Sequence, residues 1–148
     1  MTVAVAPCEV AIETRPDEPI AVRSAIDRLQ AKMQTMDTVD LPVTNHFADG
    51  LYARELFMPA DSLAVGKVHA KSHFLVVLSG EVTAWTDEGM RTLTAGEVVR
   101  TSAGTKRVAY AHTDTRLITF HATQETDIAL IEGELITPEL LEYHHDMG

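Results

Sequence analysis

The chain has 148 residues, of which 45% are hydrophobic; this suffices for one domain with a continuous core and excludes an intrinsically disordered protein. Its formal net charge of −10 opposes binding to the phosphate backbone of nucleic acids. No apolar run approaches the roughly 18 residues that a membrane span requires. Neither nucleic acid nor a membrane is therefore expected as a partner.

The cysteine content and the N-terminus bear on the compartment. A single cysteine, Cys8, excludes an intramolecular disulfide and fits a reducing environment. The short apolar patch over 3–6 has no basic segment before it, which argues against a secretory signal. These features predict a cytoplasmic protein.

The N-terminal third is expected to supply one arm and one helix. Pro7, Pro16 and Pro19 interrupt any regular pattern, so residues 1–21 are predicted to form an irregular arm ahead of a single domain over 22–148. Apolar residues then recur at helical spacing and predict a helix over 22–36 that packs on the outside of the domain. Asp40-Leu41-Pro42 ends this segment.

From Leu51 the pattern changes to short β-like segments separated by turn residues. The predicted strands are 51–58, 64–69, 73–79, 81–86, 90–94, 97–101, 106–112 and 115–121. Strands at this spacing are typical of an antiparallel sandwich or barrel, including the jelly roll. The fold class is therefore all-β, with a barrel over 51–122. One or two short helices are expected within 127–146, where Asp127 offers a helix cap and a second helix follows Pro138.

Two stretches carry a family resemblance. Gly66-Lys67-Val68-His69 and His73 precede Gly80. This spacing resembles the first motif of the cupin superfamily, in which Lys67 and His69 occupy the places of two histidines and His73 that of a glutamate.

The second stretch runs from Gly96 through Gly104 to Arg107 and resembles the second cupin motif, with Arg107 in place of its histidine. The resemblance covers about 51–123 and implies a cupin-type β-barrel. A longer pattern is also similar to small cupin-like proteins of phage and prophage genomes that have no assigned function.

The segment 73–79 is apolar on both faces, because Phe74, Val76 and Leu78 alternate with Leu75 and Val77. One face would line the barrel, and the other needs cover from the second sheet, the N-terminal helix or a partner chain. Cupins often pair through such a face, so the resemblance implies a homodimer.

Three histidines are candidate metal ligands. In a strand, side chains two apart share a face, and the cupin register places His69 inward, with His73 and His121 entering the same cavity. Three neutral imidazoles suit a divalent transition metal such as Fe²⁺, Ni²⁺, Zn²⁺ or Mn²⁺. Glu55 could serve as a carboxylate ligand or a general base. The alternative is that these histidines are polar barrel residues satisfied by hydrogen bonds.

Two cations occupy ligand positions of the family, and they suggest a different use of the cavity. A fixed cation repels a dication unless an anion lies between them. Lys67 and Arg107 are therefore expected to orient a small anionic ligand, with arginine making a bidentate contact and lysine a point contact. The alternative for Arg107 is an ordinary salt bridge to Glu55 or Asp114.

These observations support two functions. The first is a metal-dependent cupin enzyme of oxygenase, isomerase or lyase type that acts on a small anionic molecule, with Glu55, Lys67 and Arg107 as catalytic residues. The second is a non-catalytic cupin-fold module for ligand binding or assembly, of phage type and without metal.

Overall fold

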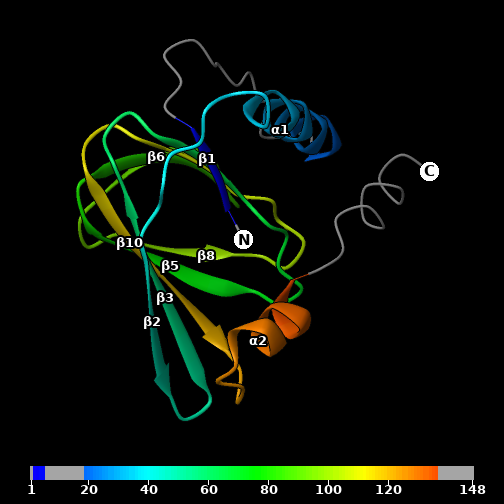
Figure 1. Cartoon of the computed structure of the whole chain (residues 1–148), viewed down its shortest axis with the longest axis vertical. Helices are drawn as coiled ribbons and strands as arrows, with labels where there is room; N and C mark the ends of the chain where they lie inside the picture. Colours follow the sequence, from blue (N-terminus) through cyan, green and yellow to red (C-terminus); the bar gives the residue numbers. More distant parts are fainter. Residues whose placement is uncertain (1, 6–18, 137–148) are drawn as a thin grey trace.

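The strands pair into two five-stranded antiparallel sheets that face each other, with helix α1 outside one of them (Figure 1). The computed structural model describes residues 2–5 and 19–136. The first sheet has the order β1 (Thr2–Val5), β4 (Leu63–Gly66), β9 (Val108–Ala111), β6 (Glu81–Thr86), β7 (Gly89–Thr94). The second has the order β2 (Val43–Ala48), β3 (Leu51–Met58), β10 (Thr115–Ala122), β5 (His73–Ser79), β8 (Val98–Thr101).

The main core lies between the two sheets and is built from alternate residues of the strands. It contains Leu56, Met58, Leu75, Val77, Val82, Leu93, Val99 and Leu117, all buried. Ala64 and Ala109 also belong to it, and they lie opposite each other across β4 and β9. Because both side chains are small, this part of the interior can hold a cavity.

Helix α1 (Pro19–Met33) covers the outer face of the first sheet. Its apolar side packs with that sheet in a second cluster of Val22, Ile26, Leu29, Met33, Leu63, Val65 and Val108. Lys106 ties the helix to the chain just before β9, because its Nζ donates to Asp27 Oδ1 at 2.7 Å and to Gln30 Oε1 at 2.5 Å. The lysine is 3% exposed, so these partners offset the cost of burying its charge.

Helix α2 (Ile128–Leu135) lies against the second sheet at the end where Tyr52 is buried. Asp127 caps the helix by accepting from the backbone N–H groups of Ala129 and Leu130. Ile131 and Leu135 pack on Tyr52. No helix in the described part of the chain is long and apolar enough to cross a membrane.

The predicted all-β fold is confirmed, and each strand predicted after residue 51 is found. Three of these strands are shorter than expected: 64–69 ends at Gly66, 97–101 begins at Val98, and 106–112 covers only Val108–Ala111. The helix predicted over 22–36 begins at Pro19 and ends at Met33. The second C-terminal helix, expected after Pro138, lies outside the described residues.

Two expectations about the N-terminal half are wrong. Residues 2–5 form β1 along β4 rather than an irregular arm. Residues 43–48 form β2, ahead of the expected start of the barrel, and pair with β3. Both are edge strands, and β2 is exposed at every position, so it shows none of the alternation that burial imposes on a strand.

Gly80, between β5 and β6, is expected to tolerate no side chain. Its φ is +88°, and a Cβ atom there would lie 2.4 Å from the carbonyl oxygen of Asp114. Gly80→Ala should lower the free energy of unfolding by at least about 2 kcal/mol in urea denaturation. Gly133→Ala is the matched control, since its Cβ would meet nothing within 4 Å on α2, and it should stabilise by about 0.5–1 kcal/mol. Equal effects of the two changes would contradict this reading of the turn.

Candidate functional site

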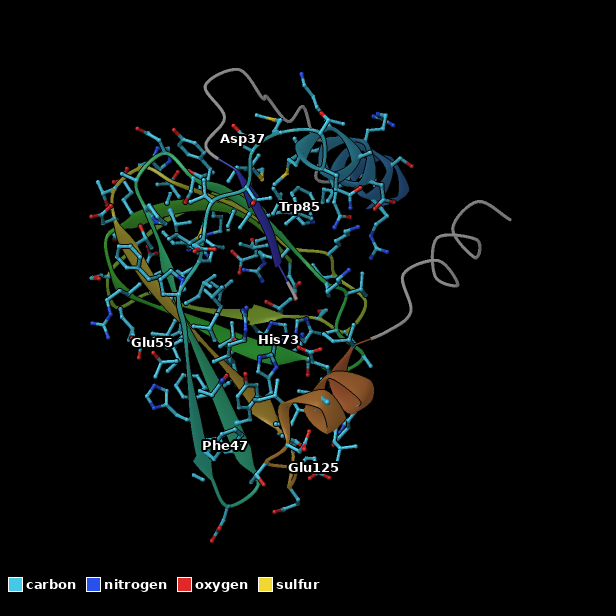
Figure 2. The ribbon with its side chains drawn as sticks, viewed as in Figure 1. Asp37, Phe47, Glu55, His73, Trp85 and Glu125 are labelled. Atoms are coloured by element: carbon cyan, nitrogen blue, oxygen red, sulfur yellow. The ribbon has the colours of Figure 1, made fainter. Side chains whose placement is uncertain are left out.

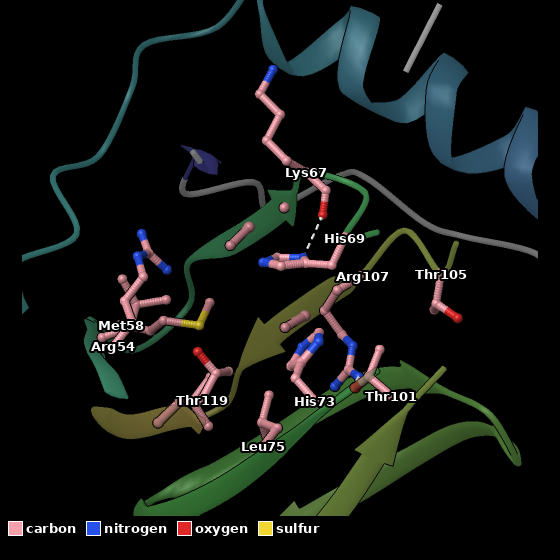
Figure 3. A pocket seen from close by; sticks show the side chains of 15 residues that line it. Arg54, Met58, Lys67, His69, His73, Leu75, Thr101, Thr105, Arg107 and Thr119 are labelled. Carbon is pink, nitrogen blue, oxygen red and sulfur yellow. Dashed lines mark hydrogen bonds between the residues drawn. The ribbon is translucent and has the colours of Figure 1, made fainter. Parts of the chain in front are cut away.

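A cavity of about 80 Å³ opens between the two sheets (Figure 3). One part of its wall is apolar and is made by Leu56, Met58, Ala64, Leu75, Ala109 and Leu117. The other part is polar and is made by Arg54, Lys67, His69, His73, Thr101, Thr105, Arg107 and Thr119. No aspartate or glutamate lines it among the residues described, so the charged groups of the wall are all basic.

Three imidazoles from different segments meet at this cavity. His69 follows β4, His73 begins β5, and His121 lies near the end of β10. Their ring centroids are 4.6 Å apart for His69 and His73, 4.6 Å for His73 and His121, and 5.0 Å for His69 and His121. His69 and His73 line the cavity, while His121 lies behind them and stacks on Tyr52 at 5.8 Å. The structure thus brings together the three histidines that the sequence singled out.

The ring nitrogens differ in their partners. His69 Nδ1 lies 3.1 Å from the carbonyl oxygen of Lys67, and His121 Nε2 lies 2.8 Å from Thr119 Oγ1. His69 Nε2 and His73 Nδ1 are buried and have no hydrogen-bond partner among the described residues. A buried polar atom without a partner is costly, so both atoms are candidates for contact with a ligand.

Burial keeps the three imidazoles neutral. It is the largest cause of a lowered pKa at each of them, and the pKa falls to about 4 for His73 and to about 3 for His121. The neighbouring histidines and a nearby arginine lower these pKa values further, because each would repel a second positive charge. At neutral pH the rings therefore act as uncharged hydrogen-bonding groups.

Arg107 brings a guanidinium into the cavity from the start of β9. Its Nη2 donates to Thr101 Oγ1, whereas Nε and Nη1 are buried and have no partner among the described residues. Burial lowers the pKa of Arg107 to about 10, so the group remains charged at neutral pH. Neither acid suggested from the sequence pairs with it, since Glu55 binds Arg116 and Asp114 accepts from the backbone N–H of Ala60.

Glu55 does not line the cavity where the sequence predicted it. It lies on the outer face of β3, where its carboxylate binds Arg116 at 2.7 Å and His46 at 3.2 Å. Figure 2 shows Glu55 toward the left side of the molecule and His73 near its centre. The physical reason is the alternation of the strand, which turns the neighbouring Arg54 inward instead.

The side chain of Lys67 lines the cavity, but its amine does not lie beside Arg107. Figure 3 shows the side chain extending away from Arg107 and His73, toward helix α1. The predicted strand runs through residue 69, whereas β4 ends at Gly66. The shared face expected for Lys67 and His69 is lost there.

Arg54 is the charged residue of the described wall that was not identified from the sequence. It lies on the inner face of β3 with Leu56 and Met58, opposite Thr119 on β10. Burial is the largest cause of its lowered pKa. A basic residue alternating with apolar ones on an inward face is the signal that could have identified it.

The histidine cluster does not fit a metal ion in this arrangement. No group of three His, Cys, Asp or Glu side chains within the described residues could hold one. The rings of His69 and His121 stack at 12°, so lone pairs in these nearly parallel planes do not converge on one point. Arg54 and Arg107 on the same wall would also repel a dication.

The fold is that of a cupin. Ectoine synthase from P. lautus is similar over 70% of this chain and 78% of its own, with a TM-score of 0.55 and 13% identity. The plu4264 protein of Photorhabdus luminescens is similar over 64% and 84%, with a TM-score of 0.52 and 10% identity. The cupin_2 domain of an XRE family transcriptional regulator from Enterobacter cloacae is similar over 57% and 98%, with a TM-score of 0.50 and 16% identity.

These identities show the fold alone, and the neighbours include both an enzyme and a domain of a regulator. No protein-family model matches the sequence, and no curated protein matches it. The resemblance to phage proteins finds no support in these neighbours and stays a prediction. A shared fold does not determine function, which depends on the residues of the site.

The neutral histidines should make the protein less stable in acid. An unfolded histidine takes up a proton near pH 6.5, whereas burial holds the pKa of His73 at about 4 and that of His121 at about 3. Between the folded-state and unfolded-state pKa values, the unfolded chain binds more protons than the folded chain. The free energy of unfolding therefore falls as the pH falls below about 6.5. His73→Gln should reduce this slope by up to about 1.4 kcal/mol per pH unit in urea titrations. An unchanged slope would contradict the lowered pKa.

Proposed function

We propose that this cupin binds a small anionic molecule in the cavity between its sheets, with Arg107 as the principal partner. The observation that carries the proposal is the guanidinium itself: within residues 2–5 and 19–136, two of its buried nitrogens have no partner and no acid lines the cavity. An unpaired buried charge costs several kcal/mol, roughly, and a bound anion would offset that cost. Thr101 holds the guanidinium in place through Nη2.

The neutral imidazoles are suited to the uncharged part of the same ligand. His69 Nε2 and His73 Nδ1 have no partner among the residues that the structure covers. A neutral imidazole nitrogen can donate or accept according to its tautomer. A ligand with an anionic group on Arg107 and a polar group beside these nitrogens would satisfy each of them. Glu55 and the Lys67 amine have no part in this proposal.

A metal-dependent enzyme is the second candidate. It is favoured by the two unpaired nitrogens on histidines whose ring centroids lie 4.6 Å apart. A site made with His121 would require its Nε2 to leave Thr119 and the rings to reorient. An anion between the ion and Arg107 would also be needed. The bound ion, one of Fe²⁺, Ni²⁺, Zn²⁺ or Mn²⁺, would supply the Lewis-acid or redox chemistry of an oxygenase, isomerase or lyase.

The protein is also proposed to be a homodimer through the outer face of the second sheet. Phe74, Leu78 and Val98 are 51%, 39% and 59% exposed there. Val76 lies between Val98 and Ile118 in the pairing of β8, β5 and β10, so the apolar side chains form one continuous face. Helix α1 covers the outer face of the other sheet, whereas no described helix covers this one.

Arg107→Gln should abolish stabilisation by small anions. In chloride-free buffer, 10 mM acetate, butyrate, succinate or phosphate is added and unfolding is followed by heat. A site with a Kd of about 1 mM gains about 1.4 kcal/mol at this concentration. Arg116→Gln is the matched control, because this exposed arginine pairs with Glu55 outside the cavity. Absence of stabilisation by every anion, or an equal loss in both variants, would refute the proposal.

Metal analysis separates the two candidates. Protein prepared without a histidine tag is expected to carry substoichiometric transition metal, and added Zn²⁺, Ni²⁺ or Fe²⁺ should leave its Tm unchanged, since a ligand of the native state must raise it. Near one equivalent of metal, lost in His69→Ala and retained in His112→Ala, would establish the second candidate instead. His112 serves as the control because it bonds Thr83 away from the cavity.

Val98→Glu should dissociate the dimer. Light scattering is expected to give twice the 16.2 kDa chain mass for the unmodified protein and the chain mass itself for this variant. Leu130→Glu is the control, since Leu130 is 58% exposed on α2 rather than on the sheet. Each chain carries a charge of −10, so salt should strengthen the pairing. A monomeric unmodified protein, or equal dissociation by both changes, would contradict this interface.

A further inference from the structure

We infer that the ligand of this cavity is a short-chain monocarboxylate, with its carboxylate on Arg107 and its alkyl part against the apolar wall. The inference rests on the proposed function and names the chemical class of the anion. It follows from how charge, apolar surface and space are distributed in the cavity.

Arg107 is the basic residue of the described cavity wall that has buried nitrogens without a partner. Its Nε and Nη1 have no partner in the part of the chain that the structure describes, whereas Arg54 has an interaction of its own. The Lys67 amine extends away from Arg107 (Figure 3). One unsatisfied guanidinium calls for one negative charge, because a second charge on the ligand would lose its hydration without a partner here.

The polar groups beside Arg107 form one end of the cavity. His73 pairs with Thr101 across β5 and β8, and Thr101 accepts from Arg107. Figure 3 shows these three side chains close together on one side of the pocket. The carboxylate of the ligand therefore has its donors at this end.

The rest of the wall is apolar and comes from both sheets. Leu56, Met58, Leu75 and Leu117 belong to one sheet, and Ala64 and Ala109 to the other. Phosphate or sulfate would place hydrated oxygens against this surface, whereas an alkyl chain gains free energy there, about 0.8 kcal/mol for each buried CH₂.

The space limits the length of that chain. A cavity of about 80 Å³ has room for on the order of five to eight water-sized groups. Butyrate has six non-hydrogen atoms and hexanoate has eight, so about these lengths should fill it, and octanoate should exceed it.

The test is an NMR titration of the ¹⁵N-labelled full chain in chloride-free buffer. Formate, acetate, butyrate, hexanoate, octanoate, succinate and phosphate are compared. Affinity should rise about fourfold for each added CH₂ up to butyrate or hexanoate and fall at octanoate. Phosphate and succinate should bind at least about tenfold more weakly than butyrate.

Two alanine-to-valine substitutions test the apolar wall. Ala109→Val narrows the cavity. It should weaken the binding of butyrate by at least about fourfold and leave the binding of formate unchanged. Ala111→Val is the matched control, since Ala111 is buried on the same strand but does not line the cavity. Equal weakening of butyrate binding in both variants would overturn the assignment of the wall. If a variant fails to fold, the comparison of chain lengths on the unmodified protein still tests the inference.

The outcomes separate the inference from the proposal beneath it. The monocarboxylate assignment is overturned if the affinity does not depend on chain length, or if phosphate or succinate binds most tightly. If that binding is still lost in Arg107→Gln, the anion site itself stands. Absence of binding by all seven anions refutes both.

Discussion

The guanidinium of Arg107 is a positive charge inside the barrel, and two of its nitrogens have no partner among the residues described. Its neighbour Lys106 shows how the rest of the structure supports this placement. The two cations are adjacent in sequence, yet Lys106 points out to Asp27 and Gln30 on helix α1 while Arg107 points into the cavity. The helix satisfies one charge, while the other faces the cavity.

The chemistry of the three histidines follows from the same charge. Burial and the proximity of positive groups lower the pKa of each ring, so the cluster adds hydrogen-bonding nitrogens without adding charge. The stacked rings of His69 and His121 fit this uncharged state. The cavity therefore presents neutral donors and acceptors around Arg107, whose Nε and Nη1 have no partner within the described ranges.

The fold was predictable from the sequence wherever burial imposes a pattern. Strand alternation and turn glycines located the strands after Leu51, and the motif spacing turned Arg107 inward. The edge strand β2 was missed because its exposure at every position removes that pattern. The site was less predictable for two reasons. An error of one residue in the strand register interchanges the faces of Glu55 and Arg54. Partners such as Lys106 and Asp27 are 79 positions apart in the sequence.

The most direct measurement of the central claim is the side-chain ¹⁵N spectrum of Arg107 during titration with butyrate. Loss of one Nε–H signal in Arg107→Gln assigns the resonance. Under this account that signal shifts and saturates as one butyrate binds per chain, because Nε gains a charged acceptor. A signal that stays unchanged at saturating butyrate would contradict the claim that this guanidinium holds the ligand.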